Sequence, residues 1–165
     1  MTRRGPFYWN DADFRAPWVH LDACVAGIGI SGAACARVLA GLGARVQVVD
    51  ARDGEPEQAV AAELRALGVD VRLGDGDTLP DAADLVVTSP GWRRESVLFA
   101  AAAAAGVPVW GEPELAWRLR RPGAPAWLVV TGTDGKTTTT LMLESILRAA
   151  GHRTASARNI GTALV

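Results

Sequence analysis

Gly135, Lys136 and Thr137 are the strongest chemical signal in the sequence. A glycine loop followed by a lysine and a hydroxyl at the start of a helix is typical of sites that bind nucleotide phosphates. Backbone N–H groups would surround the phosphate oxygens, Lys136 would reach the β- and γ-phosphates, and the Thr137 hydroxyl would bind Mg²⁺. The strict P-loop pattern needs a further glycine where Val130 stands, so the motif has the shorter G-x-x-G-K-T form. The candidate loop consists of Gly132, Thr133, Asp134, Gly135, Lys136, Thr137 and Thr138.

A second glycine-rich loop of a different kind lies far upstream. Gly27 to Gly32 satisfies G-x-G-x-x-G between an apolar run and a helical pattern, and Asp50 ends the next apolar run. Such glycines let the backbone approach a diphosphate, which the helix N-terminus attracts, and an acid at the second strand can bind a ribose or a base. The pattern does not distinguish NAD from a UDP-sugar, and the glycines could also serve only a tight turn and close helix packing.

Ser89, Pro90 and Gly91 end a later apolar run. In open α/β sheets ligands bind beyond the carboxyl ends of the strands, so these residues would line the same site. A plain turn at the end of a strand is the alternative.

Apolar runs and helical patterns alternate along the chain. Strands are predicted at 21–26, 45–50, 69–74, 83–89 and 107–111, and helices at 32–43, 55–68, 95–106 and 112–120. This alternation predicts βαβ units and a parallel sheet, so residues 1–119 are expected to form a Rossmann-like α/β domain.

Proline and glycine at 120–125 predict a linker, after which a new unit begins. Its expected parts are a strand at 126–131, a helix at 137–151 and a strand at 153–158. So few elements cannot bury both faces of a parallel sheet. Residues 126–165 are therefore interpreted as the truncated start of a P-loop ATP-binding α/β domain, and the chain as a fragment of a longer protein.

Composition argues against several classes of partner. The 165 residues have a net charge of −1, which gives no general attraction for nucleic acid or an anionic membrane. No apolar run approaches the roughly 18–20 residues of a membrane span, and the N-terminus lacks the apolar core of a signal peptide. Cys24 and Cys35 lack metal-binding spacing and are expected to be buried free thiols in the cytoplasm.

The two glycine loops, in this order and joined by this linker, resemble those of the Mur ligases. The matching stretches are "GIGISG", "VVD", "SPG", "VPVWGEPELAW", "VTGTDGKTTTT" and "NIG", within about residues 22–165. The resemblance is strongest to the members that add D-glutamate. It implies an ATP- and Mg²⁺-dependent ligase of peptidoglycan precursor synthesis, which would phosphorylate the carboxylate of UDP-N-acetylmuramoyl-L-alanine and join it to D-glutamate.

The resemblance also implies roles for individual residues. Gly29, Ile30, Ser31 and Gly32 would bind the diphosphate, Asp50 and Arg52 would lie near the uracil, and Ser89, Pro90 and Gly91 would follow the substrate. Lys136 and Thr137 would serve ATP and magnesium, and Asn159 would contact the substrate near its reacting end.

The sequence departs from the family pattern at several positions. Asp134 stands where asparagine is usual, Ala51 where a hydroxyl residue can help to hold the base, Arg158 where glycine is common, and Ala163 where proline is common. The remaining catalytic groups of the family would lie beyond Val165, so the 165 residues alone are expected to have no ligase activity.

Three other interpretations stay open. An NAD(P)-binding oxidoreductase domain would explain the first loop but not Lys136. A non-enzymatic nucleotide-binding fragment would not explain why the two loops occur together. A Mur ligase that adds L-alanine or diaminopimelate would differ mainly in substrate.

Overall fold

The computed structural model describes residues 18–89, 92, 95–121, 123–157 and 163–165. Contacts divide the chain into two compact units, of which the first reaches to Leu119 and includes Val165. The second unit runs from Arg120 to Leu164.

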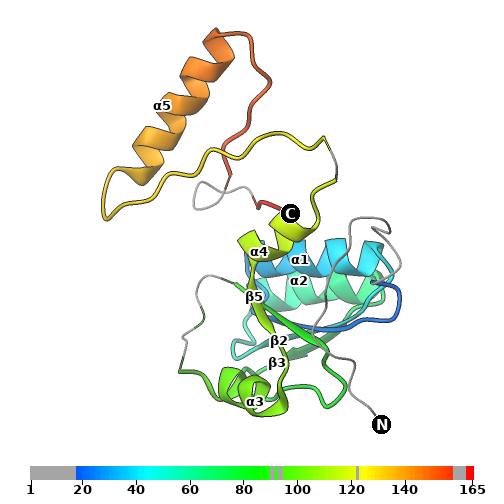
Figure 1. Cartoon of the computed structure of the whole chain (residues 1–165). Coiled ribbons are helices and arrows are strands. Elements are labelled where there is room, and N and C mark those ends of the chain that lie inside the picture. The colour runs from blue at the N-terminus through cyan, green and yellow to red at the C-terminus, as the bar shows by residue number, and fades with distance from the viewer. Residues whose placement is uncertain (1–17, 90–91, 93–94, 122, 158–162) are drawn as a thin grey trace. The chain divides into compact units, whose positions relative to one another are not determined.

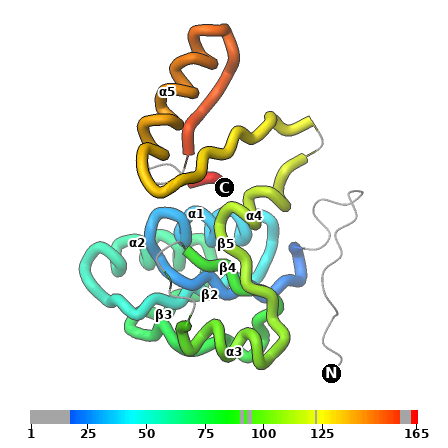
Figure 2. The backbone as a smooth tube through the Cα atoms, turned by 60° about the vertical axis from the view of Figure 1, so that its left-hand side comes forward, coloured from blue at the N-terminus to red at the C-terminus, as the bar shows by residue number. Residues whose placement is uncertain are grey.

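Strands and helices alternate through the first unit, as predicted, except that no helix stands among the described residues between the third and fourth strands (Figures 1 and 2). The strands are β1 (Asp22–Ala26), β2 (Arg45–Asp50), β3 (Asp70–Leu73), β4 (Leu85–Thr88) and β5 (Val109–Gly111). The helices are α1 (Ile30–Gly41), α2 (Glu55–Ala66), α3 (Val97–Ala105) and α4 (Glu112–Arg118).

The five strands form one parallel sheet in the order β3-β2-β1-β4-β5. The predicted α/β class with a parallel sheet is therefore confirmed. The chain moves outward from β1 to β3, then returns to the other side of β1 at β4, so the strand order reverses between β1 and β4. Ligands of doubly wound sheets bind at such a reversal, beyond the carboxyl ends of the strands.

Both faces of the sheet are covered (Figure 1). Successive side chains of a strand point to opposite faces. Val25 of β1 accordingly packs with Leu39 of α1, Leu64 of α2 and Leu115 of α4, whereas Ala26 packs on the other face with Leu98 of α3. A sheet buried on both faces holds the carboxyl ends of its strands in fixed positions, which is what a binding site needs.

The second unit contains one regular element among its described residues, the helix α5 (Lys136–Ala149). The strands predicted at 126–131 and 153–158 are wrong for the described residues, which are not paired in a ladder there. A strand needs a neighbour to satisfy its backbone N–H and C=O groups, and the described residues of this unit offer none. The strand–loop–helix frame of a P-loop is therefore not formed in the described part of the chain.

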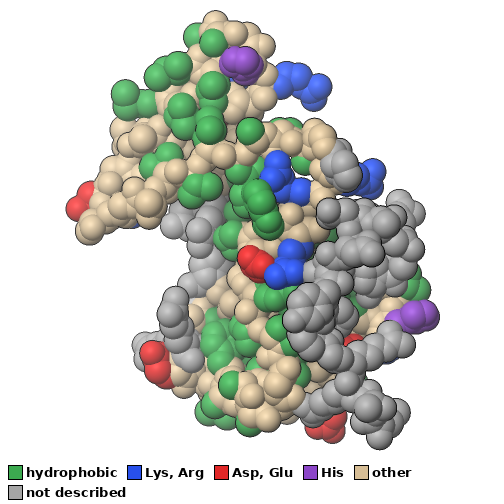
Figure 3. All heavy atoms as spheres, viewed as in Figure 1, with side chains coloured by type: hydrophobic (Ala, Val, Ile, Leu, Met, Phe, Trp, Pro, Cys, Tyr) green, Lys and Arg blue, Asp and Glu red, His purple; other side chains and the backbone are tan. Residues whose placement is uncertain are grey.

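No residue of α5 is buried. Leu141, Met142 and Ile146 on the helix are 49%, 61% and 62% exposed, and hydrophobic side chains lie at the surface of this unit in Figure 3. The helix thus keeps an apolar face without building a core of its own.

Candidate nucleotide-binding site

Gly27 lies directly after β1, where the loops that follow β1 and β4 meet. Its φ of +100° is one that residues with a side chain rarely adopt, and a Cβ at this position would overlap the Ser89 hydroxyl and lie 2.8 Å from Nε1 of Trp92. Its N–H donates to the carbonyl of Val49 at 2.8 Å, and the N–H of Ser89 donates to that of Ala26 at 3.0 Å. The first glycine loop and Ser89 are therefore brought together at the strand-order reversal.

The first turn of α1 is open to an anion. Its N-cap is Gly29, which offers no side-chain cap, and the turn contains no acidic residue. The first N–H groups of a helix have no partner within it and carry a partial positive charge. Gly29 and Ile30 are exposed, Ile30 at 68%, so a diphosphate can approach this turn without displacing a side chain.

Gly32 allows α1 to pack closely against the first glycine loop. A Cβ at this position would overlap the carbonyl oxygen of Gly27 and lie 2.8 Å from its carbonyl carbon. A Cβ on Gly29, by contrast, would meet nothing within 4 Å. The third glycine of the motif therefore lets α1 start close to the glycine loop, and the second leaves the backbone accessible.

Asp50 at the end of β2 is 5% exposed and its carboxylate is fully engaged inside the protein. Oδ2 accepts from the N–H of Ile28 at 2.8 Å and from Nη2 of Arg52 at 3.1 Å. Oδ1 accepts from the N–H and Nε of Arg52 at 2.9 and 3.2 Å. Burial opposes ionisation, but the hydrogen bonds from Arg52 and Ile28 outweigh it, and the pKa of Asp50 is lowered. The sequence predicted Asp50 as a ligand group, whereas its bonds here hold the glycine loop to the end of β2.

Arg52 is the exposed partner of this pair. Its guanidinium lies between Asp50 and Glu57, with Nη1 2.9 Å from Oε1 of Glu57, and its side chain is 62% exposed. The Asp50 hydrogen bonds and coulombic attraction raise its pKa further, so it stays charged. An arginine held on one edge and open to solvent on the other can still contact a ligand at the end of β2.

Trp92 belongs to this region although the sequence analysis did not single it out. Its Nε1 end lies beside Gly27, and its Cη2 atom is 3.2 Å from where a Cβ on Gly76 would stand. That same Cβ would be 2.9 Å from the Cβ of Ala51. An aromatic residue directly after the Ser-Pro-Gly stretch was the available signal.

Three predicted site residues, Pro90, Gly91 and Asn159, lie outside the described residues, as does Arg158.

The second glycine loop precedes α5, and its residues 132–138 are exposed. Gly132 and Gly135 have φ values of +149° and +73°, and Gly135 is the N-cap of α5 without a side-chain cap or an acid in the first turn. Nζ of Lys136 donates to the carbonyls of Gly132 and Thr133, the latter at 2.7 Å. The Lys136 ammonium group therefore lies against the same loop whose backbone N–H groups would bind a phosphate.

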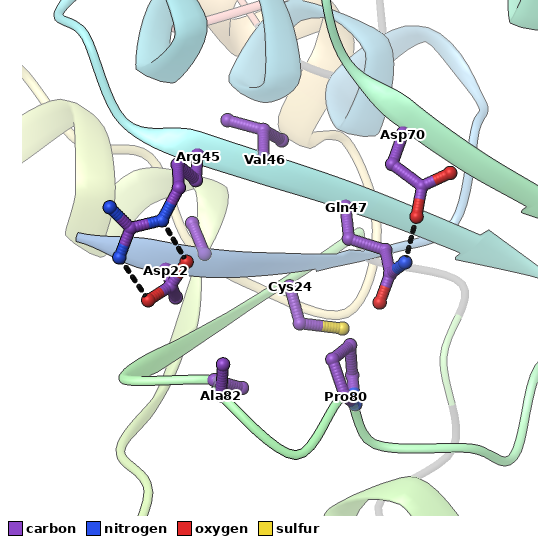
Figure 4. A pocket seen from close by; sticks show the side chains of 10 residues that line it. Asp22, Cys24, Arg45, Val46, Gln47, Asp70, Pro80 and Ala82 are labelled. Atoms are coloured by element: carbon purple, nitrogen blue, oxygen red, sulfur yellow. Dashed lines mark hydrogen bonds and ion pairs between the residues drawn. The ribbon is translucent and has the colours of Figure 1, made fainter. Parts of the chain in front are cut away.

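A shallow pocket lies near the starts of β1, β2 and β3, away from this region (Figure 4). Its polar side chains bind one another, since Arg45 pairs with Asp22, and Gln47 donates to Asp70. Burial raises the pKa of the Cys24 thiol to about 12, which makes it a poor nucleophile. The pocket therefore shows no group ready for chemistry.

The described residues lack two further features. They contain no group of three or more His, Cys, Asp and Glu side chains placed to hold a metal ion. None of their helices has the length and apolar character needed to cross a bilayer.

Comparison with known proteins decides the family. Residues 22–111 match the model of the N-terminal domain of MurD-like Mur ligases. The chain belongs to this family. The matched MurD-like domain runs from the first residue of β1 to the last of β5, and so includes the first glycine loop, Asp50 and Ser89.

Individual relatives agree with the MurD-like assignment. UDP-N-acetylmuramoylalanine–D-glutamate ligases of Streptomyces avermitilis and Streptomyces coelicolor are each 61% identical, over 148 and 145 residues. These stretches cover 90% and 86% of this chain but 32% and 31% of the relatives, so the chain spans about a third of their length. The crystal structure of the UDP-N-acetylmuramate-alanine ligase MurC from Thermotoga maritima matches with a TM-score of 0.51 and 27% identity, over 79% of this chain and 30% of that one.

Proposed function

We propose that this MurD-like chain is the substrate-binding part of an ATP-dependent ligase that adds D-glutamate to UDP-N-acetylmuramoyl-L-alanine. The observation that carries the proposal is the open first turn of α1, placed beside Ser89 and Arg52 at the strand-order reversal of a MurD-like domain. The high identity to relatives with this printed activity supports the choice of D-glutamate over L-alanine or diaminopimelate as the added amino acid.

The first unit would bind the UDP part of the substrate. N–H groups of Ile30, Ser31 and Gly32 at the start of α1 would take the diphosphate, because a helix N-terminus favours negative charge. Arg52 would lie near the uracil, held in place by Asp50. Ser89, together with Pro90 and Gly91, would follow the substrate away from the diphosphate.

The second glycine loop would bind ATP and Mg²⁺, and its exposed glycines and uncapped helix start fit a phosphate group. Phosphorylation turns a carboxylate, which is a poor acyl donor, into one that an amine can attack. Lys136 would leave the loop carbonyls to neutralise charge on the phosphates, the Thr137 hydroxyl would bind the metal, and Asn159 would contact the substrate near its reacting end.

The NAD(P) alternative is disfavoured by Asp50. In dinucleotide-binding domains the acid at the end of the second strand accepts bonds from the ribose. Here both oxygens of Asp50 already accept two N–H bonds each from Ile28 and Arg52, and the residue is buried. A ribose would have to displace these internal bonds.

The two buried free cysteines agree with a reducing, cytoplasmic location for the ligase.

Isothermal titration calorimetry of the chain with UDP-N-acetylmuramoyl-L-alanine, and with NAD as the control ligand, tests the proposal. Binding of the UDP compound without binding of NAD is the expected result. Ser31→Glu would place a negative charge in the first turn of α1 and is expected to abolish binding, whereas Ser31→Ala keeps the backbone donors and should retain it. Binding of NAD alone would overturn the proposal.

We expect no amide product when the 165 residues are mixed with ATP, Mg²⁺ and both substrates. The loop that would bind ATP belongs to a unit whose helix buries no residue, so nothing holds its phosphate contacts in a reactive geometry. Product formation by the purified chain would show that this loop is organised enough for catalysis.

A further inference from the structure

We propose that the planar base of the ligand stacks on the indole of Trp92, which makes Trp92 a ligand-binding residue of this site. The inference rests on the proposed function, because it assumes that a uridine diphosphate group occupies the carboxyl edge of β1, β2 and β4. The ligand chemistry that it adds is a planar heteroaromatic ring next to the diphosphate.

The position of the indole carries the inference. Its Nε1 atom would lie 2.8 Å from a Cβ on Gly27, at the glycine loop, and its Cη2 atom 3.2 Å from a Cβ on Gly76. Gly27 follows β1, and the N–H of Asp75, beside Gly76, donates to the carbonyl of Asp50 at 3.1 Å. The ring therefore extends from the loop after β1 to the loop after β3, which the hydrogen bond from Asp75 to Asp50 joins to the end of β2.

Among the described residues, those beside Cη2 of the indole are small. Ala51 follows Asp50 directly, and its methyl group lies close to Gly76. A methyl group and a glycine give a base no side-chain hydrogen-bond partner at this point, so contact with the faces of flat groups is the interaction available there. The glycines at 27 and 76 are also what allow a residue as large as tryptophan to lie against the backbone.

Trp92 is held in place before any ligand arrives. Its N–H donates to the carbonyl of Ser89 at 3.3 Å, and its ring packs with Phe99 of α3 at a centroid distance of 6.0 Å and an interplanar angle of 33°. The side chain is half-buried, with part of it packed against the apolar cluster on the α3 face of the sheet. A ring fixed in this way loses little conformational entropy when a base stacks on it.

Binding of UDP and of pyrophosphate to the whole chain separates this role from a purely structural one. Base–aromatic stacking contributes about 1–3 kcal/mol per base, so Trp92→Ala should weaken UDP binding by about 5- to 150-fold. Pyrophosphate has no base, and its affinity should change less than twofold. Trp92→Phe, which keeps an aromatic face, should restore most of the UDP affinity. Trp117→Ala, which removes a 53% exposed tryptophan from α4, is the matched control and should bind UDP as the wild type does.

Fluorescence gives a second readout. UDP should change the tryptophan emission of the wild-type chain, and this change should be lost in Trp92→Phe although that variant still binds. Stacking tolerates different bases, so CDP should show the same loss of affinity in Trp92→Ala.

The possible outcomes are distinct. Equal UDP affinity of Trp92→Ala and the wild type would overturn the role of Trp92 and leave the proposed function standing. An equal loss of UDP and pyrophosphate binding would show that the indole only supports the glycine loop. A wild-type chain that binds neither UDP nor UDP-N-acetylmuramoyl-L-alanine would overturn both proposals.

Discussion

The carboxylate of Asp50 shows how a motif residue can act inside the protein instead of on a ligand. An acid after the second strand of a Rossmann-like unit is expected to face the nucleotide. In this chain the acid joins the N–H of Ile28, in the first glycine loop, to the guanidinium of Arg52, after β2. In the proposed site, its contribution to binding would be to fix the first glycine loop and Arg52 in position.

Asp50→Asn should lower the free energy of unfolding by about 1.5–3 kcal/mol, because the amide replaces one accepting oxygen by a donor that faces N–H groups. The pKa of Asp50 is lowered in the folded state, so its stabilisation is complete above the unfolded pKa of about 3.9 and is lost as the pH falls through the folded pKa. Urea unfolding at a series of pH values should show that the difference in unfolding free energy between the wild type and Asp50→Asn shrinks as the pH falls. Asp81→Asn, at an exposed turn, is the control, and its unfolding free energy should equal that of the wild type at every pH.

Gly32→Ala tests the close approach of α1 to the glycine loop. The added Cβ would overlap the carbonyl oxygen of Gly27, so the helix must shift, at a cost of about 1–3 kcal/mol in unfolding free energy. Gly41→Ala is the matched change in the same helix, where a Cβ meets nothing within 4 Å, and it should stabilise by about 0.4–1 kcal/mol. Denaturant unfolding measures both, and a neutral Gly32→Ala would contradict the contact.

At the scale of elements, the sequence predicted the first unit well because local pattern and tertiary environment agree there. The apolar runs of β1 and β4 are strands buried on both faces, and Pro56 and Pro113 stand in the first turns of α2 and α4, where they are favourable. Helix ends differed from prediction by a few residues, mostly at terminal glycines. Helix α3 illustrates the limit, since the pattern predicts a helix over 95–106 whereas the helix lies between its N-cap Ser96 and Gly106, which has a φ of +68°.

Features that depend on contacts between residues far apart in the chain could not be predicted from the sequence. The apolar run at 126–131 has the composition of a strand, but a strand forms only beside another, and the described residues of the second unit provide none. Trp92 was missed for a similar reason, because nothing in its local sequence tells that its ring reaches both Gly27 and Gly76. The internal bonds of Asp50 were equally invisible, since the motif is the same whether the acid faces inward or outward.

The lack of buried residues in α5 leads to a prediction about its dynamics. Helices of this length, 14 residues, are marginal in water unless tertiary contacts support them. Ser156 and Arg148 bind Glu144, but a few polar contacts near the surface add little. In hydrogen exchange the amides of α5 should therefore exchange far faster than those of β1 and α1. Comparable protection in the two units would show that α5 has tertiary support.

At the scale of the whole molecule, the two glycine loops stand in very different settings. The first lies on a five-stranded sheet with both faces covered, and the second on a helix without a core. The relatives are about three times as long as this chain, since it covers 32% of one of them. Binding at the first loop should therefore be separable from binding at the second, although the proposed ligase would need both.

Thermal unfolding of the whole chain makes this separation measurable. A ligand that binds only the folded state stabilises it by about 1.4 kcal/mol at ten times its Kd, which for a unit of this size raises the Tm by roughly 5–10 °C. UDP-N-acetylmuramoyl-L-alanine should produce such a shift, because its proposed site is part of the cooperative sheet. ATP with Mg²⁺ should leave the transition unchanged, because its proposed loop has no core whose unfolding could be coupled to binding. A shift with ATP that disappears in Lys136→Ala would instead mean that the second loop is already organised in this chain and stabilises the cooperative unit.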